Sequence, residues 1–456
     1  MINRIIDFSV QNKLVVFAII AAACVVGWWA IATVPVDAMP DIGDTQVIIY
    51  SRWDRSPDIM EDQVTYPIVS SMLGAPHVKT VRGFSDYGYS YVYVIFEDST
   101  DLYWARSRTL EYLSAVLPRL PEGVKTELGP DATGLGWVFQ YALVDTSGKK
   151  NLGDLRSVQD WNLRYQLRSV PGVAEVAPVG GFTRQFQVNV DPNRLQAFGI
   201  PISRVVEAVR GGNEEAGARV LEFGGTEYMV RGRGYAESIA DFESIALGTG
   251  SDGAPIRIRD VGQVVLGPDV RRGVAELDGA GEVVSGIVLM RSGENALDVI
   301  NRVKSKIKEI EPGLPPGVKI VPVYDRSQLI QRSISNVKLT IVEVVVTVVL
   351  IILIFLWHFP SAAIPIVTMP VAVLLSFIPF RVMGISANIM SLTGVAIAFS
   401  ELVDASIVVV EQTHKKLEIW DKSGRGRDHR EVVLSGVKEV AGPTFFALLV
   451  IAISFL

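Results

Sequence analysis

The chain has 456 residues, of which 49% are hydrophobic and 20% are charged, and its mean hydropathy is +0.32. This composition excludes a disordered chain and an ordinary water-soluble globule, and it indicates a membrane protein. The 43 basic and 49 acidic residues give a formal charge of -6, so the sequence lacks the basic excess that nucleic-acid binding requires.

The N-terminal part of the chain predicts one membrane-spanning helix. Leu14 to Ile31 is apolar and about 18 residues long, enough to span roughly 30 Å of hydrocarbon at about 1.5 Å per residue. A cleaved signal peptide is the alternative, but its apolar region usually covers about 7 to 15 residues before a small-residue cleavage site. Thr33-Val34-Pro35 follows here instead. We therefore predict a cytoplasmic N-terminus and a first transmembrane helix within residues 1–33.

The next part of the chain alternates between strand and helix patterns. Tyr89 to Phe96 alternates in the manner of a strand. Four stretches predict amphipathic helices, and each one runs into a proline and then a strand that contains valine. These helices are expected to begin near Ser56, Asp101, Leu152 and Ala296.

This repetition indicates an internal duplication. The hexapeptides Leu120–Lys125 and Leu314–Lys319 are nearly the same, LPEGVK and LPPGVK. Four β-α-β half-units make two β-α-β-β-α-β modules of ferredoxin-like type. We assign the first module to residues 34–137 and the second module to residues 138–185 and 270–337.

The second module is interrupted by an insert at about residues 186–269. The insert is rich in glycine and charge, and Ala216 to Glu237 predicts a protruding hairpin around Gly224-Gly225. Such a hairpin suggests contact with another subunit, and a plain surface loop is an equal alternative. The predicted fold class is an α+β membrane protein with transmembrane helices, duplicated ferredoxin-like modules and an inserted subdomain.

The C-terminal part predicts further transmembrane helices. Helices two to four, within residues 338–411, correspond to Leu339–Trp357, Ser361–Phe380 and Asn388–Val410. A cytoplasmic loop at residues 412–442 follows, and residues 443–456 form the start of a fifth helix. This last run is only about 14 residues long, too short to span a bilayer. Either the sequence is a fragment of a longer protein, or a partner shields that end.

Basic residues predict the orientation in the membrane. Lys and Arg concentrate in residues 412–442 and in the short N-terminus with Arg4 and Lys13, and cytoplasmic flanks retain such residues. Four crossings between these two segments place both on the same side. The segment from Val34 to Lys338 then lies outside the cytoplasm.

Asp404 is the candidate functional residue of the membrane region. An ionisable group near the middle of a span costs about 2.5 to 3.5 kcal/mol, so it must be paired, hydrated or protonated. Glu401 and Glu411 lie near the same helical face, because they are three residues before and seven residues after it. Such an acid can take up a proton on one side and release it on the other. The alternatives are a fixed ion pair for Asp404 and an interfacial position for Glu411.

The sequence contains no motif for another source of energy. It has no Walker lysine loop, no His-Glu-x-x-His, no paired cysteines and no nucleophile elbow. We therefore predict a secondary transporter, which is not an enzyme and carries no cofactor.

Five stretches of the chain are characteristic of one transporter family. They are Val34–Ile42, Gly129–Trp137, Glu227–Arg231, Arg271–Leu277 and Tyr324–Ile330. Together with the order of spans, modules and insert, they resemble the N-terminal half of the resistance-nodulation-division (RND) transporters, from Met1 to Leu456. Drug exporters of this superfamily have two adjacent aspartates in the fourth span. Here Val403 precedes Asp404, which favours the heavy-metal efflux branch.

The resemblance implies a homotrimeric proton antiporter of the cell inner membrane, in contact with membrane lipid. Its expected function is efflux of heavy-metal cations, of the copper and silver type or a divalent ion, from the periplasm or the cytoplasm. The modules would be periplasmic porter modules and the insert a docking subdomain, with a periplasmic adaptor protein and an outer-membrane channel as partners. The resemblance carries a proton relay onto Asp404 and Glu411. It gives no role to Glu401 and no metal ligand in this half.

Departures from the family pattern concern the metal. Copper exporters of this branch have methionines in the fourth span and the porter domain that are proposed to pass the ion along. At the matching places this chain keeps Met390 but has Leu402, Val409 and Val270. Thioethers suit monovalent copper, so their loss leaves a divalent ion open. The alternatives are an exporter of organic molecules and, if the chain ends at residue 456, a non-transporting membrane-tethered interaction module.

Overall fold

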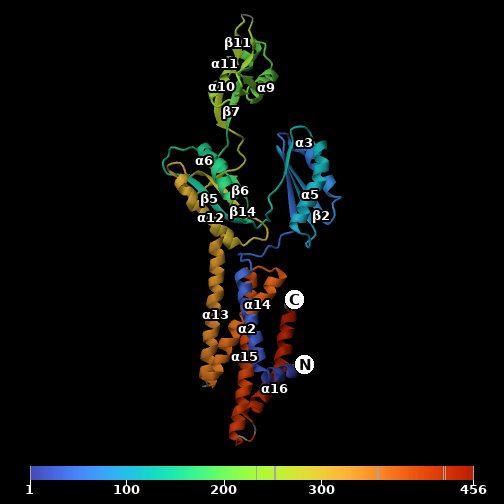
Figure 1. Cartoon of the computed structure of the whole chain (residues 1–456), viewed down its shortest axis with the longest axis vertical. Coiled ribbons are helices and arrows are strands. Elements are labelled where there is room, and N and C mark those ends of the chain that lie inside the picture. Colours follow the sequence, from blue (N-terminus) through green and yellow to red (C-terminus); the bar gives the residue numbers. More distant parts are fainter. Residues whose placement is uncertain are drawn as a thin grey trace.

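The computed structural model describes residues 2–232, 234–250, 253–356, 359–424, 426 and 428–454. Figure 1 shows three parts along the long axis. A bundle of long helices forms one end, two modules of strands and helices lie beyond it, and the insert lies at the end farthest from the bundle.

The helix bundle consists of segments that are apolar over most of their length. Five helices in the described part of the chain are long and apolar enough to cross a membrane. They are α2 (Lys13–Thr33), α13 (Arg326–Leu356), α14 (Phe359–Met383), α15 (Ile389–Lys422) and α16 (His429–Ser454), and a short helix α1 (Ile2–Gln11) precedes them. Gly27 allows α2 and α14 to pack closely, because a Cβ there would lie 2.5 Å from the Leu374 carbonyl oxygen.

The first module contains a four-stranded sheet in the order β2-β3-β1-β4. Its elements are β1 (Gln46–Arg52), α3 (Pro57–Met60), a π-helical turn (Glu61–Thr65), α4 (Tyr66–Met72), β2 (Val78–Asp86), β3 (Tyr89–Phe96), α5 (Leu102–Val116), a 3₁₀ turn (Leu117–Arg119) and β4 (Lys125–Leu128). Alternate residues of β3, among them Val92 and Val94, are fully buried under the helices. This is the alternation predicted for the strand at Tyr89 to Phe96.

The second module has the same order of elements, interrupted by the insert. Its elements are β5 (Trp137–Asp145), α6 (Leu152–Val158), a π-helical turn (Gln159–Leu163), α7 (Arg164–Arg168), β6 (Val173–Val179), β13 (Ala275–Glu276), β14 (Glu282–Met290), α12 (Ala296–Ile310), a 3₁₀ turn (Glu311–Gly313) and β15 (Val318–Asp325). Strand β14 pairs with β5 and β6, and β15 pairs with β5. The sequence predicts the positions of all four module helices, but not the π-helical turns within two of them.

The insert is a small subdomain with its own hydrophobic core. Its elements are β7 (Arg184–Val190), α8 (Pro192–Ala197), α9 (Ile202–Gly211), β8 (Ala216–Phe223), β9 (Thr226–Gly232), α10 (Ile239–Ser244), β10 (Ala246–Thr249), β11 (Pro255–Arg257), α11 (Ile258–Val261) and β12 (Gly262–Pro268). Strands β8 and β9 form the predicted hairpin. Gly224 and Gly225 make its turn with φ values of 65° and 78°, which favour glycine.

In the C-terminal part the helices extend beyond the predicted apolar spans. Helix α13 begins at Arg326 and not near Leu339, and most of the predicted loop at residues 412–442 is helical, because α15 ends at Lys422 and α16 begins at His429. Hydropathy locates the apolar part of a helix, whereas amphipathic turns extend the helix beyond it. Pro443 therefore lies inside α16, and that helix is long enough to span a membrane. Trp357 and residues 455–456 of the predicted spans lie outside the described residues.

Candidate functional site

Helix α15 positions the predicted carboxylates, and its outer end is held by a capping box. The Asn388 side-chain oxygen accepts a hydrogen bond from the Ser391 backbone N–H at 3.0 Å, and the Ser391 hydroxyl accepts one from the Asn388 N–H at 2.9 Å. These bonds satisfy two donors of the first turn. The start of α15 is therefore well defined, and the carboxylates follow along a continuous helix.

The carboxylates lie on a side of α15 that the other helices do not cover. Val403 and Val410 are only 6% and 4% exposed, and Val403 packs against Met369 of α14. Asp404 and Glu411, seven residues apart, are both exposed. The sequence prediction that they share one face therefore agrees with the helix geometry.

The three carboxylates have different surroundings. Among the described residues, none forms a hydrogen bond or ion pair with the Asp404 side chain. A Glu411 oxygen lies 2.9 Å from the Lys415 ammonium nitrogen, one turn later in the same helix. Glu401 is partly buried and follows Ala398 by three residues. Ala398 lines an apolar cavity of about 450 Å³ between α14 and α15, and Glu401 is not among the residues that line it.

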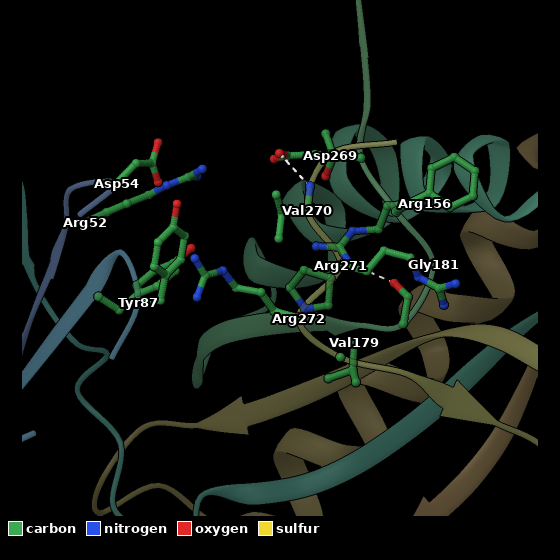
Figure 2. A pocket seen from close by; sticks show the side chains of 16 residues that line it. Arg52, Asp54, Tyr87, Arg156, Val179, Gly181, Asp269, Val270, Arg271 and Arg272 are labelled. Atoms are coloured by element: carbon green, nitrogen blue, oxygen red, sulfur yellow. Dashed lines mark hydrogen bonds between the residues drawn. The ribbon is translucent and has the colours of Figure 1, made fainter. Parts of the chain in front are cut away.

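A second candidate region is a cleft of about 540 Å³ between the first module and the second module, next to the base of the insert. Figure 2 shows Arg52, Asp54 and Tyr87 on one side and Arg271 and Arg272 on the other. The Arg272 guanidinium lies 4.3 Å from the ring centre of Tyr89 and therefore joins the two sides by a cation–π contact.

The lining of this cleft does not provide a soft-metal site. Val270 is one of its lining residues, and none of the sixteen is a methionine, cysteine or histidine. Asp54 and Asp269 are its two carboxylates. Across the described part of the chain, no group of three or more His, Cys, Asp or Glu side chains could hold a metal ion. Met390 is 68% exposed near the outer end of α15.

Sequence reasoning missed one polar contact at the outer end of the helix bundle. Arg326 forms an ion pair with Asp37 at 3.2 Å, although the two are 289 positions apart. The available signal was that both residues lie in stretches that carry the family resemblance. Without a fold, nothing in the sequence brings those stretches together.

Comparisons with known proteins agree on one family. Residues 5–456 match the AcrB/AcrD/AcrF family. The cation efflux system protein CusA of Escherichia coli is 48% identical over 462 residues, which cover 100% of this chain and 44% of CusA. The cobalt-zinc-cadmium resistance protein CzcA of Cupriavidus metallidurans is 37% identical over 468 residues, with the same coverages. A crystal structure of a heavy metal efflux pump has a TM-score of 0.82 and 31% identity, covering 98% of this chain and 43% of that one.

Proposed function

The chain belongs to the AcrB/AcrD/AcrF family, and on this premise we propose that the complete protein exports heavy-metal cations across the inner membrane in exchange for protons. The names of CusA, CzcA and the solved pump support a cation as the substrate. The chain spans less than half the length of these relatives. Transport is therefore proposed for the complete protein.

The observation that carries the proton mechanism is the position of Asp404 on the uncovered face of α15. A charged carboxylate that faced lipid here would cost about 2.5 to 3.5 kcal/mol. We propose that protein or water covers this face in the complete pump. There, protonation removes the charge of Asp404 and deprotonation restores it, so the preferred packing of α15 alternates between two states.

Glu411 is proposed as the cytoplasmic end of the relay. It lies two helical turns from Asp404 on the same side of α15. Its ion pair with Lys415 is half exposed, so water reaches it and proton exchange with the cytoplasm is open. No role is proposed for Glu401.

Exposed apolar surfaces support a homotrimer. In α5 and the turn after it, Tyr103, Leu110 and Leu117 are spaced by seven residues and are 51%, 54% and 41% exposed. Such a stripe is typical of helices that pack against copies of themselves. At the insert hairpin, Phe223 and Met229 are 80% and 83% exposed. We propose that both surfaces contact neighbouring subunits.

The two modules are proposed to be duplicated ferredoxin-like porter modules in the periplasm. Their common order of elements supports a duplication. The insert is proposed to be the docking subdomain, because it lies farthest from the membrane helices (Figure 1). Its partners would be a periplasmic adaptor protein and an outer-membrane channel.

The metal is proposed to be copper, silver or a divalent ion of the kind named for CzcA. Leu402, Val409 and Val270 offer no sulfur, which weakens the argument for monovalent copper. The chain is 48% identical to CusA and 37% identical to CzcA. Identity therefore favours a CusA-like substrate, whereas the missing thioethers leave the divalent ions open.

The test is growth of a metal-sensitive bacterium that expresses the complete protein with its adaptor and channel. We expect protection against at least one of copper, silver, cobalt, zinc or cadmium, and loss of protection when the proton gradient is collapsed. Protection against organic toxicants alone would identify an exporter of organic molecules. If the protein is present in the membrane and protects against none of the compounds tested, a non-transporting module would be favoured.

A further inference from the structure

Two distant segments meet where the membrane helices join the second module. Asp37 follows α2, and Arg326 is the first residue of α13. The Arg326 Nη1 donates to both Asp37 carboxylate oxygens, at 3.2 and 3.4 Å. The side chains are only 3% and 18% exposed. We call Pro35–Ala38 together with Arg326 the outer joint.

On one side, the outer joint is tied to α15. The Ala387 N–H donates to the Pro35 carbonyl at 2.8 Å, and the Asp37 N–H donates to the Ala387 carbonyl at 3.2 Å. The N–H of Ile389, the first residue of α15, donates to the Ala38 carbonyl at 3.1 Å. These three backbone bonds fix the segment after α2 to the outer end of the helix that carries Asp404.

On the other side, the outer joint belongs to the second module. Strand β15 ends at Asp325 and α13 begins at Arg326, with no loop between them. The Lys304 ammonium of α12 lies 2.5 Å from an Asp325 oxygen and donates to the Ser327 hydroxyl at 2.8 Å. Ala38 and Ile330, at 0% and 1% exposure, are part of the hydrophobic core of this module. The start of α13 therefore moves with the module.

We propose that Asp37 and Arg326 are the positioning pair that transmits a displacement of α15 to the second module. The inference rests on the proposed proton-driven function and assigns a role within it. The bond from Ile389 to Ala38 also links the two sides, because Ala38 packs in the core of the second module, whereas the ion pair is the contact that joins them through buried charges. Arg326 also keeps its buried Nε without a hydrogen-bond partner among the described residues. Removal of Asp37 would therefore leave a buried cation without compensation.

The experiment uses the complete pump in a Cys24→Ser background with spin labels at Ser70→Cys of α4 in the first module and at Ser169→Cys after α7 in the second module, so that the distance reports movement of the second module. Both positions are exposed. We expect the label-to-label distance in the wild-type pair to change between acidic and alkaline buffer. We expect Asp37→Asn to remove this change and to lower the maximal transport rate by about tenfold, with unchanged half-saturation for the metal. The single variant Arg326→Lys should retain part of the wild-type transport rate, because lysine keeps the positive charge but lacks the planar guanidinium group of arginine.

Two further variants control for unfolding and for general loss of charge. The double variant Asp37→Asn with Arg326→Gln leaves no buried charge, so it should fold as a trimer and still lack the distance change. Glu282→Gln breaks the exposed Arg271–Glu282 pair of the same module and should keep both readouts. If the wild type exports metal but either Asp37 variant retains the distance change and the rate, the pair is not a coupling element. Absence of transport in the wild type would instead reject the proposed function.

Discussion

The side of α15 on which the carboxylates lie decides whether they are available for proton transfer. Helical spacing alone predicts that Asp404 and Glu411 share a face, and the structure agrees. The sequence does not predict which face the bundle covers, because valines stand on all sides of Asp404, at positions 403, 408, 409 and 410. The packing of Val403 against Met369 of α14 identifies the covered face of α15. Periodicity identifies a face only where polar and apolar residues alternate.

Replacement of Asp404 by asparagine should abolish metal resistance of the complete protein, because an amide of the same shape does not take up or release a proton. Trimer content of the membrane, measured by cross-linking, should not change. Asp404→Glu should retain part of the resistance. The matched control is Glu418→Gln, which removes an exposed carboxylate of the same helix that pairs with Lys422 at 2.7 Å. Wild-type resistance in Asp404→Asn would remove this residue from the mechanism.

Thioethers at two of the three altered positions should shift the metal preference. Val270→Met combined with Leu402→Met adds soft ligands in the cleft and in α15. It should raise protection against silver or monovalent copper by about threefold or more relative to zinc. Minimal inhibitory concentrations in one strain would measure the ratio. Val270→Leu combined with Leu402→Ile provides apolar bulk without sulfur. An equal shift in that control would show that volume, and not sulfur, sets the preference.

Among whole elements, the short-range signals were the most informative. The helix predicted to begin near Asp101 has this residue as its N-cap, which accepts a hydrogen bond from the Trp104 N–H at 2.8 Å, and α12 begins at Ala296 as predicted. These features depend on neighbouring residues, so local pattern suffices. The π-helical turns and the early start of α13 depend on tertiary packing. Ile330 extends α13 into the core of the second module, which no hydropathy window detects.

A charge in the α5 stripe should weaken the trimer. Leu110→Glu places a carboxylate at the middle of the exposed apolar row, where burial against a neighbouring copy would cost several kcal/mol. Size-exclusion chromatography with light scattering should show monomers at concentrations at which the wild type is trimeric. Ile202→Glu, on α9 of the insert, is the control because Ile202 is similarly exposed, at 62%. A trimeric Leu110→Glu protein would exclude α5 from the subunit contact.

The contact at the start of α13 should make stability depend on pH. Burial disfavours the charged form of Asp325, but hydrogen bonds from Lys304 and Ser327 outweigh it and hold the pKa of Asp325 below its usual value. A lowered pKa stabilises the fold above the pKa of the unfolded chain, and this contribution disappears as the pH falls. Asp325→Asn should therefore lower the melting temperature at neutral pH by about 2 to 4 °C.

The difference in melting temperature between wild type and Asp325→Asn should narrow below about pH 4, where aspartate becomes protonated in the unfolded chain. Asp298→Asn, an exposed residue of the first turn of α12, is the comparison. A pH-independent difference for Asp325→Asn would point to lost packing and not to lost charge.

For the whole molecule, the sequence predicted the parts better than their assembly. Span, module, insert and helix bundle follow from composition, repeats and hydropathy. Their relative placement involves contacts between residues far apart in the sequence, such as Arg326 with Asp37 and Arg272 with Tyr89. Each of these contacts joins segments that single-sequence patterns treat separately. A pair of residues so far apart carries no periodic signal, so only the folded chain reveals it.

The chain enters and leaves the insert through one pair of adjacent strands. Arg184 of β7 lies opposite Pro268 of β12, and the Asp269 N–H donates to the Thr183 carbonyl at 2.8 Å. Because the two ends of this subdomain lie side by side, the sheet below closes in the same way whatever stands between them. The insert is therefore an exchangeable subdomain. We expect that transfer of the insert from one relative to another would change which adaptor protein and channel the pump binds. The two modules and the membrane helices would stay unchanged.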